Sequence, residues 1–327
     1  MTPDTDAVKR LPRSLLFGAK RLVRSRLTVN DAPTGGVLLP EILGLRRVNE
    51  QCVELEPYVN LVRSGHARSV GLLFVLGIVL SPITAWIMPG PISTAKWIAL
   101  LLFPFAAAAF GGVMYLCIHR FLGRFRGGFI RIHRGTRKLY FVTLRDERLL
   151  TLDWDQIQAL AGYIPIISAG GYTSRYPLYL IAIDWRQAPP QEMCVACGNL
   201  GWRDDGGSAR QLWDYLQIFM EHGPASLNVP SSIPPRLSRK HTFLRYYSDW
   251  VATFHRDLAT PRGRRWALLL VPAKILWLIC MVFPDSLAEF IEYNVPYTSF
   301  PKEIDELCGF NEKRVPIMRL NGERIDS

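Results

Sequence analysis

The sequence predicts an α+β membrane protein, in which a transmembrane helical hairpin precedes an antiparallel β domain closed by a helix and a helical C-terminal region. Three observations predict this fold class. Apolar residues make up 49% of the chain and are concentrated in three runs, at residues 70–88, 97–118 and 266–283. After residue 120, short stretches rich in β-forming residues alternate apolar with polar positions. A helical stripe then returns at residues 209–222.

Residues 1–69 are expected to form a basic amphipathic and helical N-terminal region. Between residues 9 and 27, apolar side chains recur at roughly helical spacing among seven lysines and arginines. This pattern is typical of a basic amphipathic helix on an anionic membrane surface, and a flexible basic tail is the alternative. Residues 41–62 are expected to form a second helix that leads into the first apolar run.

Residues 70–118 are expected to form the transmembrane hairpin. The runs at 70–88 and 97–118 contain nineteen and twenty-two residues without a charge. Each is long enough to cross about 30 Å of hydrocarbon at roughly 1.5 Å per helical residue. The Pro-Gly-Pro sequence at 89–91 leaves room only for a tight reversal between them. A buried hairpin of a soluble protein is the alternative.

The distribution of positive charge predicts the orientation of the hairpin. The linker between the two runs carries one lysine, whereas several arginines flank the runs on the other side: Arg63, Arg68, Arg120, Arg124, Arg126, Arg131 and Arg134. Cytoplasmic loops carry an excess of arginine and lysine. The bulk of the chain is therefore expected on the cytoplasmic side, and the net charge of +11 suits anionic headgroups.

Residues 119–223 are expected to form a cytoplasmic, β-rich domain. Two strands at 129–133 and 138–142 form a hairpin, and three more short strands are expected at 149–154, 176–185 and 192–196. The amphipathic helix at 209–222 follows and is able to close the sheet. This order is that of a pleckstrin-homology (PH)-like barrel, and a generic antiparallel α+β domain fits the same pattern.

A proline-rich linker at 224–240 separates this domain from a helical C-terminal region at 241–327. The third apolar run, 266–283, is near the minimum length for a span and contains Pro272 and Lys274. A lysine at the centre of a span costs about 2.5–3.5 kcal/mol. Two interpretations stay open: a bent, half-inserted or hairpin-packed helix, and a true third span. Lys274 is expected to contact headgroups by snorkelling.

No constellation of residues predicts catalysis. Cys194 and Cys197 have the spacing of metal ligands, but a structural zinc site needs four ligands and the sequence offers no second pair. They are interpreted as two cysteines at the end of a strand. No nucleophile elbow, zinc-protease or Walker-type motif occurs. We therefore expect no enzyme, no cofactor and no metal, and no nucleic acid among the partners.

Four basic residues after the hairpin are candidates for contact with lipid headgroups: Arg131, Arg134, Arg137 and Lys138. Alternation places Arg131 opposite Ile130 and Ile132, and the other three belong to the following turn. Each charge near an anionic surface contributes about 1 kcal/mol. The alternative is that these residues only set the topology and stay solvated.

Four stretches of the sequence carry a resemblance: the strand pair at 130–142, the stretch 152–157 with Trp154, the stretch 176–185 and the Phe-Pro-Lys-Glu-Ile sequence at 300–304. In these stretches the chain resembles an uncharacterised family of two-span proteobacterial membrane proteins. The genes of that family often lie near type VI secretion loci. The resemblance implies a multi-pass protein of a bacterial inner membrane, in a secretion or effector-immunity context.

Two functions are compatible with these observations. The first is a non-catalytic protein-interaction module, an immunity or accessory factor whose partner is a secreted effector or a secretion-apparatus protein. The second is a lipid-responsive membrane protein whose basic cytoplasmic face binds anionic headgroups.

Overall fold

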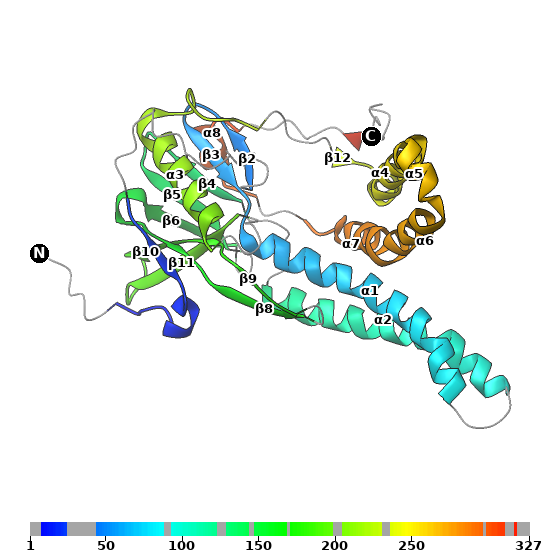
Figure 1. The fold of residues 1–327 in the computed structure, drawn as a ribbon. Coiled ribbons are helices and arrows are strands. Elements are labelled where there is room, and N and C mark those ends of the chain that lie inside the picture. Colours follow the sequence, from blue (N-terminus) through cyan, green and yellow to red (C-terminus); the bar gives the residue numbers. More distant parts are fainter. Residues whose placement is uncertain are drawn as a thin grey trace, which may run out of the picture. The chain divides into compact units, whose positions relative to one another are not determined.

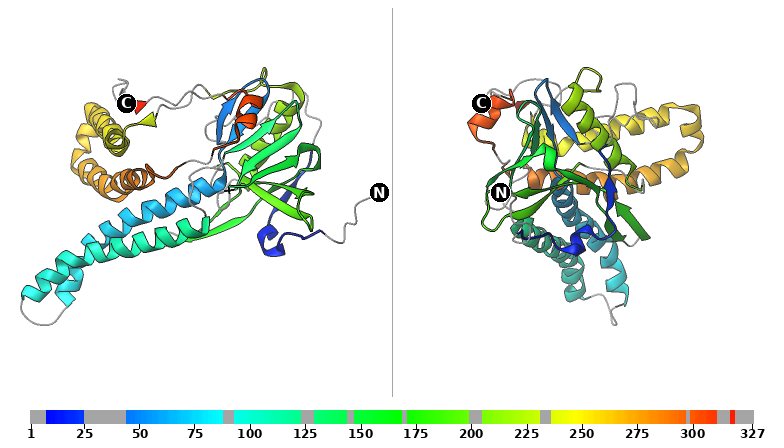
Figure 2. Two further views of the ribbon diagram at one scale, coloured as in Figure 1. Left: turned by 180° about the vertical axis from the view of Figure 1, so that it is seen from behind. Right: turned by 90° about the vertical axis from the view of Figure 1, so that its left-hand side faces the viewer.

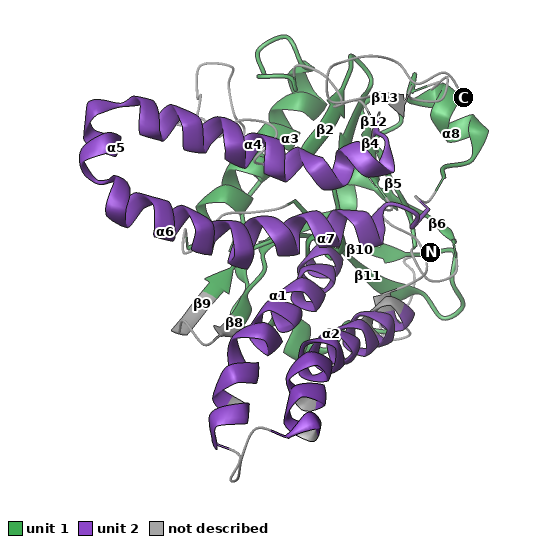
Figure 3. Cartoon of the chain, turned by 90° about the vertical axis from the view of Figure 1, so that its right-hand side faces the viewer, with its two compact units in different colours: residues 1–61, 125–234, 297–312 green, residues 62–124, 235–296, 313–327 purple. Residues whose placement is uncertain are grey.

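The computed structural model describes residues 8–24, 44–87, 93–122, 129–143, 147–168, 171–198, 205–230, 236–296, 299–310 and 317–318. The chain divides into two compact units, each built from segments far apart in the sequence (Figure 3). The β unit comprises residues 1–61, 125–234 and 297–312, and the helical unit comprises 62–124, 235–296 and 313–327. The expected domains are consecutive stretches of chain, whereas the hairpin is in fact an insertion into the β unit.

The first sheet of the β unit is assembled across that insertion. Its antiparallel strands follow the order β2-β3-β4-β5-β6, with bounds Leu45–Val48, Cys52–Leu55, Ile130–His133, Lys138–Val142 and Leu149–Asp153. Leu55 pairs with Ile130, so β3 and β4 are neighbours although two long helices lie between them in the chain. The expected strand hairpin at 129–142 and the strand at 149–154 are confirmed.

The expected helix over 41–62 is wrong for residues 45–55, which form β2 and β3. The side chain of Asn49 stabilises the turn between these two strands. Its side-chain Oδ1 accepts hydrogen bonds from the backbone N–H groups of Gln51 and Cys52, which is a typical side-chain turn. Helix begins only at Tyr58, and residues 41–43 lie outside the described residues.

The second sheet has the order β1-β7-β10-β11, with bounds Lys20–Leu22, Gln158–Ala161, Leu178–Asp184 and Gln191–Cys197. A two-stranded ribbon, β8 (Ile164–Ser168) with β9 (Gly171–Arg175), interrupts the chain between β7 and β10. The strands β10 and β11 confirm the expectations at 176–185 and 192–196, and the short 3₁₀-helix η3 (Trp154–Gln156) follows β6.

The expected amphipathic helix at residues 9–27 is wrong. This segment contains only a 3₁₀ turn, η2 (Arg13–Leu16), and the strand β1, which pairs with β7; residues 25–27 lie outside the described residues. Gly18 has a φ of +71°, which ends any right-handed helix at that point. Of the expected apolar stripe, Leu22 is buried in the core as part of β1, whereas Leu15 and Val23 are exposed.

One hydrophobic core joins both sheets with helix α3 (Gly207–His222), which confirms the expected closing helix (Figures 1 and 2). Ile130 and Ile132 enter this core from the first sheet, and Leu178 and Leu180 enter it from the second. The rings of Trp154 and Trp213, from η3 and α3, lie 5.2 Å apart at their centroids. The β unit is therefore an antiparallel α+β fold with one main core, beside which lie two smaller buried clusters.

The helical unit contains α1 (Tyr58–Ile87) and α2 (Thr94–Leu122), which pack antiparallel. Ser81 Oγ donates to the carbonyl of Leu100 at 3.2 Å, and Gly77 lies against the backbone of Pro104. Within the described residues, three helical stretches are long and apolar enough to cross a membrane: Tyr58–Ile87, Lys96–Cys117 and Ala267–Glu292.

The third of these stretches consists of α6 (Ala267–Trp277), the π-helix η4 (Leu278–Val282) and α7 (Phe283–Glu292). It packs as a hairpin with α4 (Arg239–Ala259), and α5 (Pro261–Arg265) lies between the two arms (Figure 3). The stretch packs on α4 and is also long and apolar enough to cross a membrane, so both interpretations left open by the sequence, a bent, half-inserted or hairpin-packed helix and a true third span, stay predictions. Two short elements complete the unit, β12 (Arg236–Leu237) and its parallel partner β13 (Ile317–Met318).

The expected boundaries at 224–240 and 241–327 need correction as well. Leu227, in the expected linker, packs on the core of the β unit. Helix α8 (Lys302–Leu307), in the expected C-terminal region, also belongs to the β unit. The β unit is thus completed by a segment that follows the last helix of the helical unit in the chain.

Candidate functional site: an apolar surface and a buried charge cluster

The outer surface of α1 and α2 consists largely of exposed apolar side chains. Trp86 and Phe121 are more than four-fifths exposed, and many leucines, isoleucines and phenylalanines of both helices are at least half exposed. Soluble monomers rarely expose contiguous apolar patches of more than a few hundred Å². A helix that is apolar on all sides requires an apolar surrounding. The surface of these two helices is therefore suited to hydrocarbon and not to water.

Glycines allow α1 and α2 to approach closely. A Cβ atom at Gly77 would lie 2.6 Å from the Cα of Pro104, and one at Gly111 would lie 3.0 Å from the Cα of Val70. Small residues at such positions are typical of helix pairs in membranes, where van der Waals contact replaces the hydrophobic effect as the driving force. Large apolar side chains thus cover the outer surface of the two helices, while glycines allow close packing between them.

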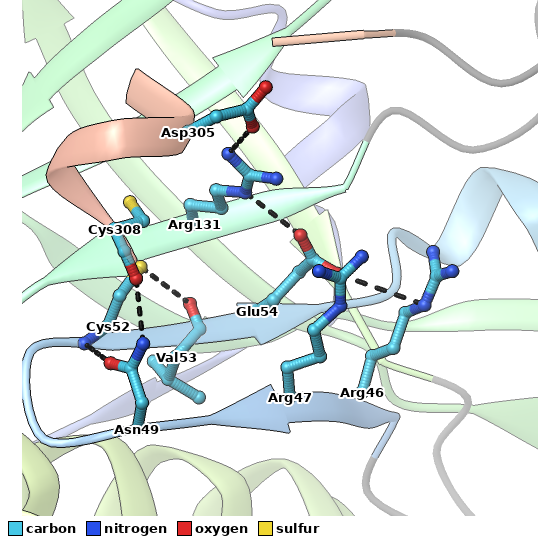
Figure 4. A network of polar contacts seen from close by, with 9 residues as sticks. All are labelled: Arg46, Arg47, Asn49, Cys52, Val53, Glu54, Arg131, Asp305 and Cys308. Atoms are coloured by element: carbon cyan, nitrogen blue, oxygen red, sulfur yellow. Dashed lines mark hydrogen bonds and ion pairs between the residues drawn. The ribbon is translucent and has the colours of Figure 1, made fainter. Parts of the chain in front are cut away.

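Arg131, the first expected headgroup residue, lies in a buried charge cluster of the β unit (Figure 4). Its Nε donates to Glu54 Oε2 at 2.9 Å, and its Nη1 donates to Asp305 Oδ1 at 2.5 Å. The Phe300 ring lies against the guanidinium, 4.0 Å from centroid to Cζ. Arg47 supplies a second cation to Glu54, with 3.1 Å between Nε and Oε1.

The electrostatics of this cluster keep Arg131 charged. Burial by itself lowers the pKa of Arg131, but the neighbouring carboxylates of Glu54 and Asp305 outweigh it and raise that pKa above its ordinary value. A fully buried Glu54 needs such compensation, since an unpaired buried charge is strongly destabilising. The expectation that Arg131 contacts headgroups is therefore wrong, because α8 and its flanking residues cover the face of β4 on which Arg131 lies.

The other three expected headgroup residues are not gathered into one cluster. Arg134 donates to the carbonyls of Met220 and Glu221 and so binds the last turn of α3. Arg137 forms a fork on Asp155, with Nη2 and Oδ1 2.6 Å apart, and this contact lowers the pKa of the Asp155 carboxyl. Lys138 pairs with His133 and Asp153 in the sheet register and is half-buried. Headgroup contact by these three stays a prediction.

Cys52 and Cys308 meet beside the charge cluster, at the place where α8 ends (Figure 4). Both are completely buried and share a small apolar cluster with Phe310. Burial raises the pKa of Cys52, whereas a hydrogen bond from Cys52 lowers the pKa of Cys308. Asn49 fixes the end of α8, because its Nδ2 donates to the Cys308 carbonyl at 2.7 Å.

Cys194 and Cys197 lie on β11, as expected for two cysteines at the end of a strand. Three positions apart on a strand, they point to opposite faces of the sheet and do not converge on one ligand. Burial raises the pKa of Cys194 to about 12, so its thiol stays protonated at neutral pH. Among the described residues, no group of three or more histidine, cysteine, aspartate or glutamate side chains is placed to hold a metal ion.

Lys274 is paired within the helical unit. Its Nζ lies 2.6 Å from Asp257 Oδ2 of α4, and Trp250 Nε1 donates to its backbone carbonyl at 3.2 Å. The expectation of a snorkelling lysine is replaced by an ion pair between the arms of a helical hairpin.

A scan against protein-family models, a search of curated proteins and a search of solved structures each found no match to this chain.

Proposed function

We propose that this chain is a non-catalytic, multi-pass protein of a bacterial inner membrane that presents a PH-like domain to the cytoplasm as a protein-interaction module. In this proposal it acts as an immunity or accessory factor for a type VI secreted effector. The observation that carries the proposal is the insertion of an apolar helical hairpin between the paired strands β3 and β4.

This insertion ties the β unit to the bilayer through two neighbouring strands. Leu55 of β3 is three residues from the start of α1, and Ile130 of β4 follows α2 after residues 123–129. A domain held by two chain connections keeps one end near the membrane at all times. Such an arrangement suits a receptor for a protein that arrives at or crosses the membrane.

The strand order supports the PH-like assignment. Strands β3 to β6 of the first sheet precede β7, β10 and β11 of the second sheet, and α3 then closes the shared core. Successive antiparallel strands in two sheets followed by one closing helix are the features that define a PH-like barrel. Of the additional strands, β2 extends an edge of the first sheet and β1 extends an edge of the second sheet.

Edge strand β6 is the proposed docking site for the partner. The N–H of Thr143 bonds to the Arg148 carbonyl, and the N–H of Trp154 bonds to the Arg137 carbonyl. Alternation along an antiparallel ladder then directs the N–H groups of residues 149, 151 and 153 away from β5. A hollow of about 500 Å³ lies beside this edge, lined by residues 148–150 and 184–188. A partner strand could add to this edge and place side chains in the hollow.

The test uses two substitutions at one position of the edge. Thr151→Pro removes an outward N–H without touching the ladder to β5, since proline is tolerated on edge strands, whereas Thr151→Ala keeps that N–H. Cells that carry a toxic secreted effector encoded beside this gene should survive with the native chain and with Thr151→Ala. They should lose protection with Thr151→Pro at equal protein level and equal thermal stability. Full protection by Thr151→Pro would contradict docking at β6, and failure of the native chain to bind or protect against that effector would contradict the immunity role.

A further inference from the structure

The hairpin of α4 and α6–α7 presents a second apolar surface. Large side chains of α6 and its flanks are more than half exposed: Trp266, Leu268, Leu269, Leu276 and Trp277. Three exposed arginines, Arg262, Arg264 and Arg265, lie in α5 at the tip of this hairpin. Length and composition alone would permit the stretch Ala267–Glu292 to cross a membrane.

Contacts along the two arms show that α6–α7 does not act alone. The rings of Phe243 and Phe290 lie 5.9 Å apart at their centroids, and Arg239 lies 4.0 Å from the Phe290 centroid. At the other end of the arms, Lys274 binds Asp257. Because these contacts run from one end of α4 to the other, any placement of α6–α7 in a bilayer brings α4 with it.

Helix α4 is unsuited to hydrocarbon. Its exposed residues include Lys240, Arg245, Asp249 and Arg256, in contrast to the charge-free middle of α1. A full crossing would bury these side chains and carry the three arginines of α5 to the far side, against the preference of arginine for the cytoplasmic side.

The first residues of α7 contact α1 where its apolar run begins. Pro284 packs on Gly71, the rings of Phe283 and Phe74 are 6.0 Å apart, and Asp285 forms an ion pair with Arg68. Residue 70 is the first of the uncharged run in α1. With α1 spanning the membrane, the start of α7 therefore lies at the level at which α1 passes from the polar to the apolar part of the bilayer.

We infer that α4–α7 form an amphipathic hairpin that lies in the cytoplasmic leaflet without crossing it, with the apolar side of α6 in the lipid and Arg262, Arg264 and Arg265 on anionic headgroups. The inference rests on the proposal that α1 and α2 span the membrane. Trp266 and Trp277, one at each end of α6, are the residue type that favours the lipid interface. The tip arginines complement anionic lipid and continue the apolar surface of α6 into a basic end.

The first test is the side of the membrane on which the tip lies. Two single cysteine substitutions are made in the full chain: Ala259→Cys, at the exposed end of α4, and Ser93→Cys, between α1 and α2. Each variant is treated with a membrane-impermeant maleimide, and the native chain gives the background reaction. Reaction of position 93 from outside, and of position 259 only after permeabilisation, supports the inference. Reaction of both from outside overturns the inference and leaves the span of α1 and α2 intact. Absence of outside reaction at position 93 overturns the proposed topology, and the inference with it.

The second test asks whether α6 is in lipid and whether the arginines hold it there. A solvatochromic fluorescent amino acid at position 268 is measured with the full chain in nanodiscs of neutral lipid and of lipid with an anionic fraction. The emission should shift to the blue in anionic discs. A triple variant of the tip arginines should lose most of that shift; its substitutions are Arg262→Gln, Arg264→Gln and Arg265→Gln. The matched control is a triple variant of α4, with Lys240→Gln, Arg245→Gln and Arg256→Gln. It removes the same amount of positive charge and should retain the blue shift. Water-like emission in both lipids, or equal loss in both triple variants, overturns the inference.

Discussion

In the β unit, charged side chains such as Glu54 and Arg131 are almost completely buried, whereas in the helical unit the large apolar side chains of α1, α2 and α6 are exposed. The β unit compensates its buried charges with one another and encloses most of its buried apolar residues in one main core. Among its described residues, the helical unit has only a small buried apolar cluster, formed by Ala67, Tyr115 and Ala288, and its close contacts include glycines, aromatic rings and ion pairs. The comparison indicates that the outer surfaces of α1, α2 and α6 are suited to lipid, whereas the β unit encloses its apolar side chains within itself.

The largest effect should come from breaking the buried charge cluster of the β unit. Glu54→Gln removes the carboxylate charge that Arg131 and Arg47 both contact and leaves the ion pair of Arg131 with Asp305 in place. Removing one partner of a buried ion pair costs about 3–5 kcal/mol. Thermal unfolding of the detergent-solubilised chain should show a loss of this order for the β unit. Arg137→Gln, which breaks an exposed ion pair, is the control and should cost less than about 1 kcal/mol. Equal effects of the two substitutions would remove the distinction between buried and exposed charge.

In the helical unit, the corresponding weak point is a glycine contact. Gly77→Leu forces a side chain against the backbone of Pro104 and should cost about 1–3 kcal/mol of overpacking. Gly112→Leu is the matched control, because a Cβ atom at Gly112 meets nothing within 4 Å. Unfolding in detergent should separate the two variants. A neutral result for Gly77→Leu would mean that α1 and α2 are not in tight contact.

The ion pair between the arms of the second hairpin should contribute less. Lys274 and Asp257 are each partly exposed, so their coupling should be about 0.2–1 kcal/mol. In a double-mutant cycle of Lys274→Met and Asp257→Asn, the double variant should therefore be more stable than the sum of the single losses implies. Strict additivity would show that the pair does not join α4 to α6.

The smallest effect concerns the pH dependence of the β unit. His133 donates from Nε2 to the Leu307 carbonyl and accepts at Nδ1 from the N–H of Thr136, an arrangement that requires neutral imidazole. Burial lowers the pKa of His133 below its ordinary value of 6.5. The unfolded chain therefore binds a proton first as pH falls below 6.5, and stability should decline there until the folded histidine titrates too. His133→Gln should flatten this part of a stability–pH profile, and an unchanged slope would assign the dependence to another group.

Local patterns were sufficient for much of the fold. The alternation at 129–142 predicts β4 and β5, the stripe at 209–222 predicts α3, and two charge-free runs predict α1 and α2. These elements are encoded by periodicity within a few residues of each other. Strand β1 is too short for a period to be visible. Strands β2 and β3 pair with each other, but β3 joins the rest of the sheet through β4, which follows α1 and α2 in the chain.

The candidate site shows the same limit. Alternation correctly places Arg131 on the face of β4 opposite Ile130 and Ile132, but it does not show what covers that face. The cover is α8, more than 170 positions further along the chain. The burial of Glu54 could not be predicted for a related reason, since a single glutamate in a segment expected to be helical gives no indication that it is buried. In α4, Asp257 is visible as a charge, but only the hairpin geometry makes it the partner of Lys274.

Labelling of Ser93→Cys and Glu147→Cys in right-side-out vesicles tests the central claim most directly. Ser93 lies between α1 and α2, and Glu147 is an exposed residue of the β unit beside β6. We expect an impermeant maleimide to react with position 93 from outside and to reach position 147 only after permeabilisation. Protection of position 93, or reaction of both positions from outside, would contradict a hairpin that crosses the membrane and holds the β unit on the cytoplasmic side.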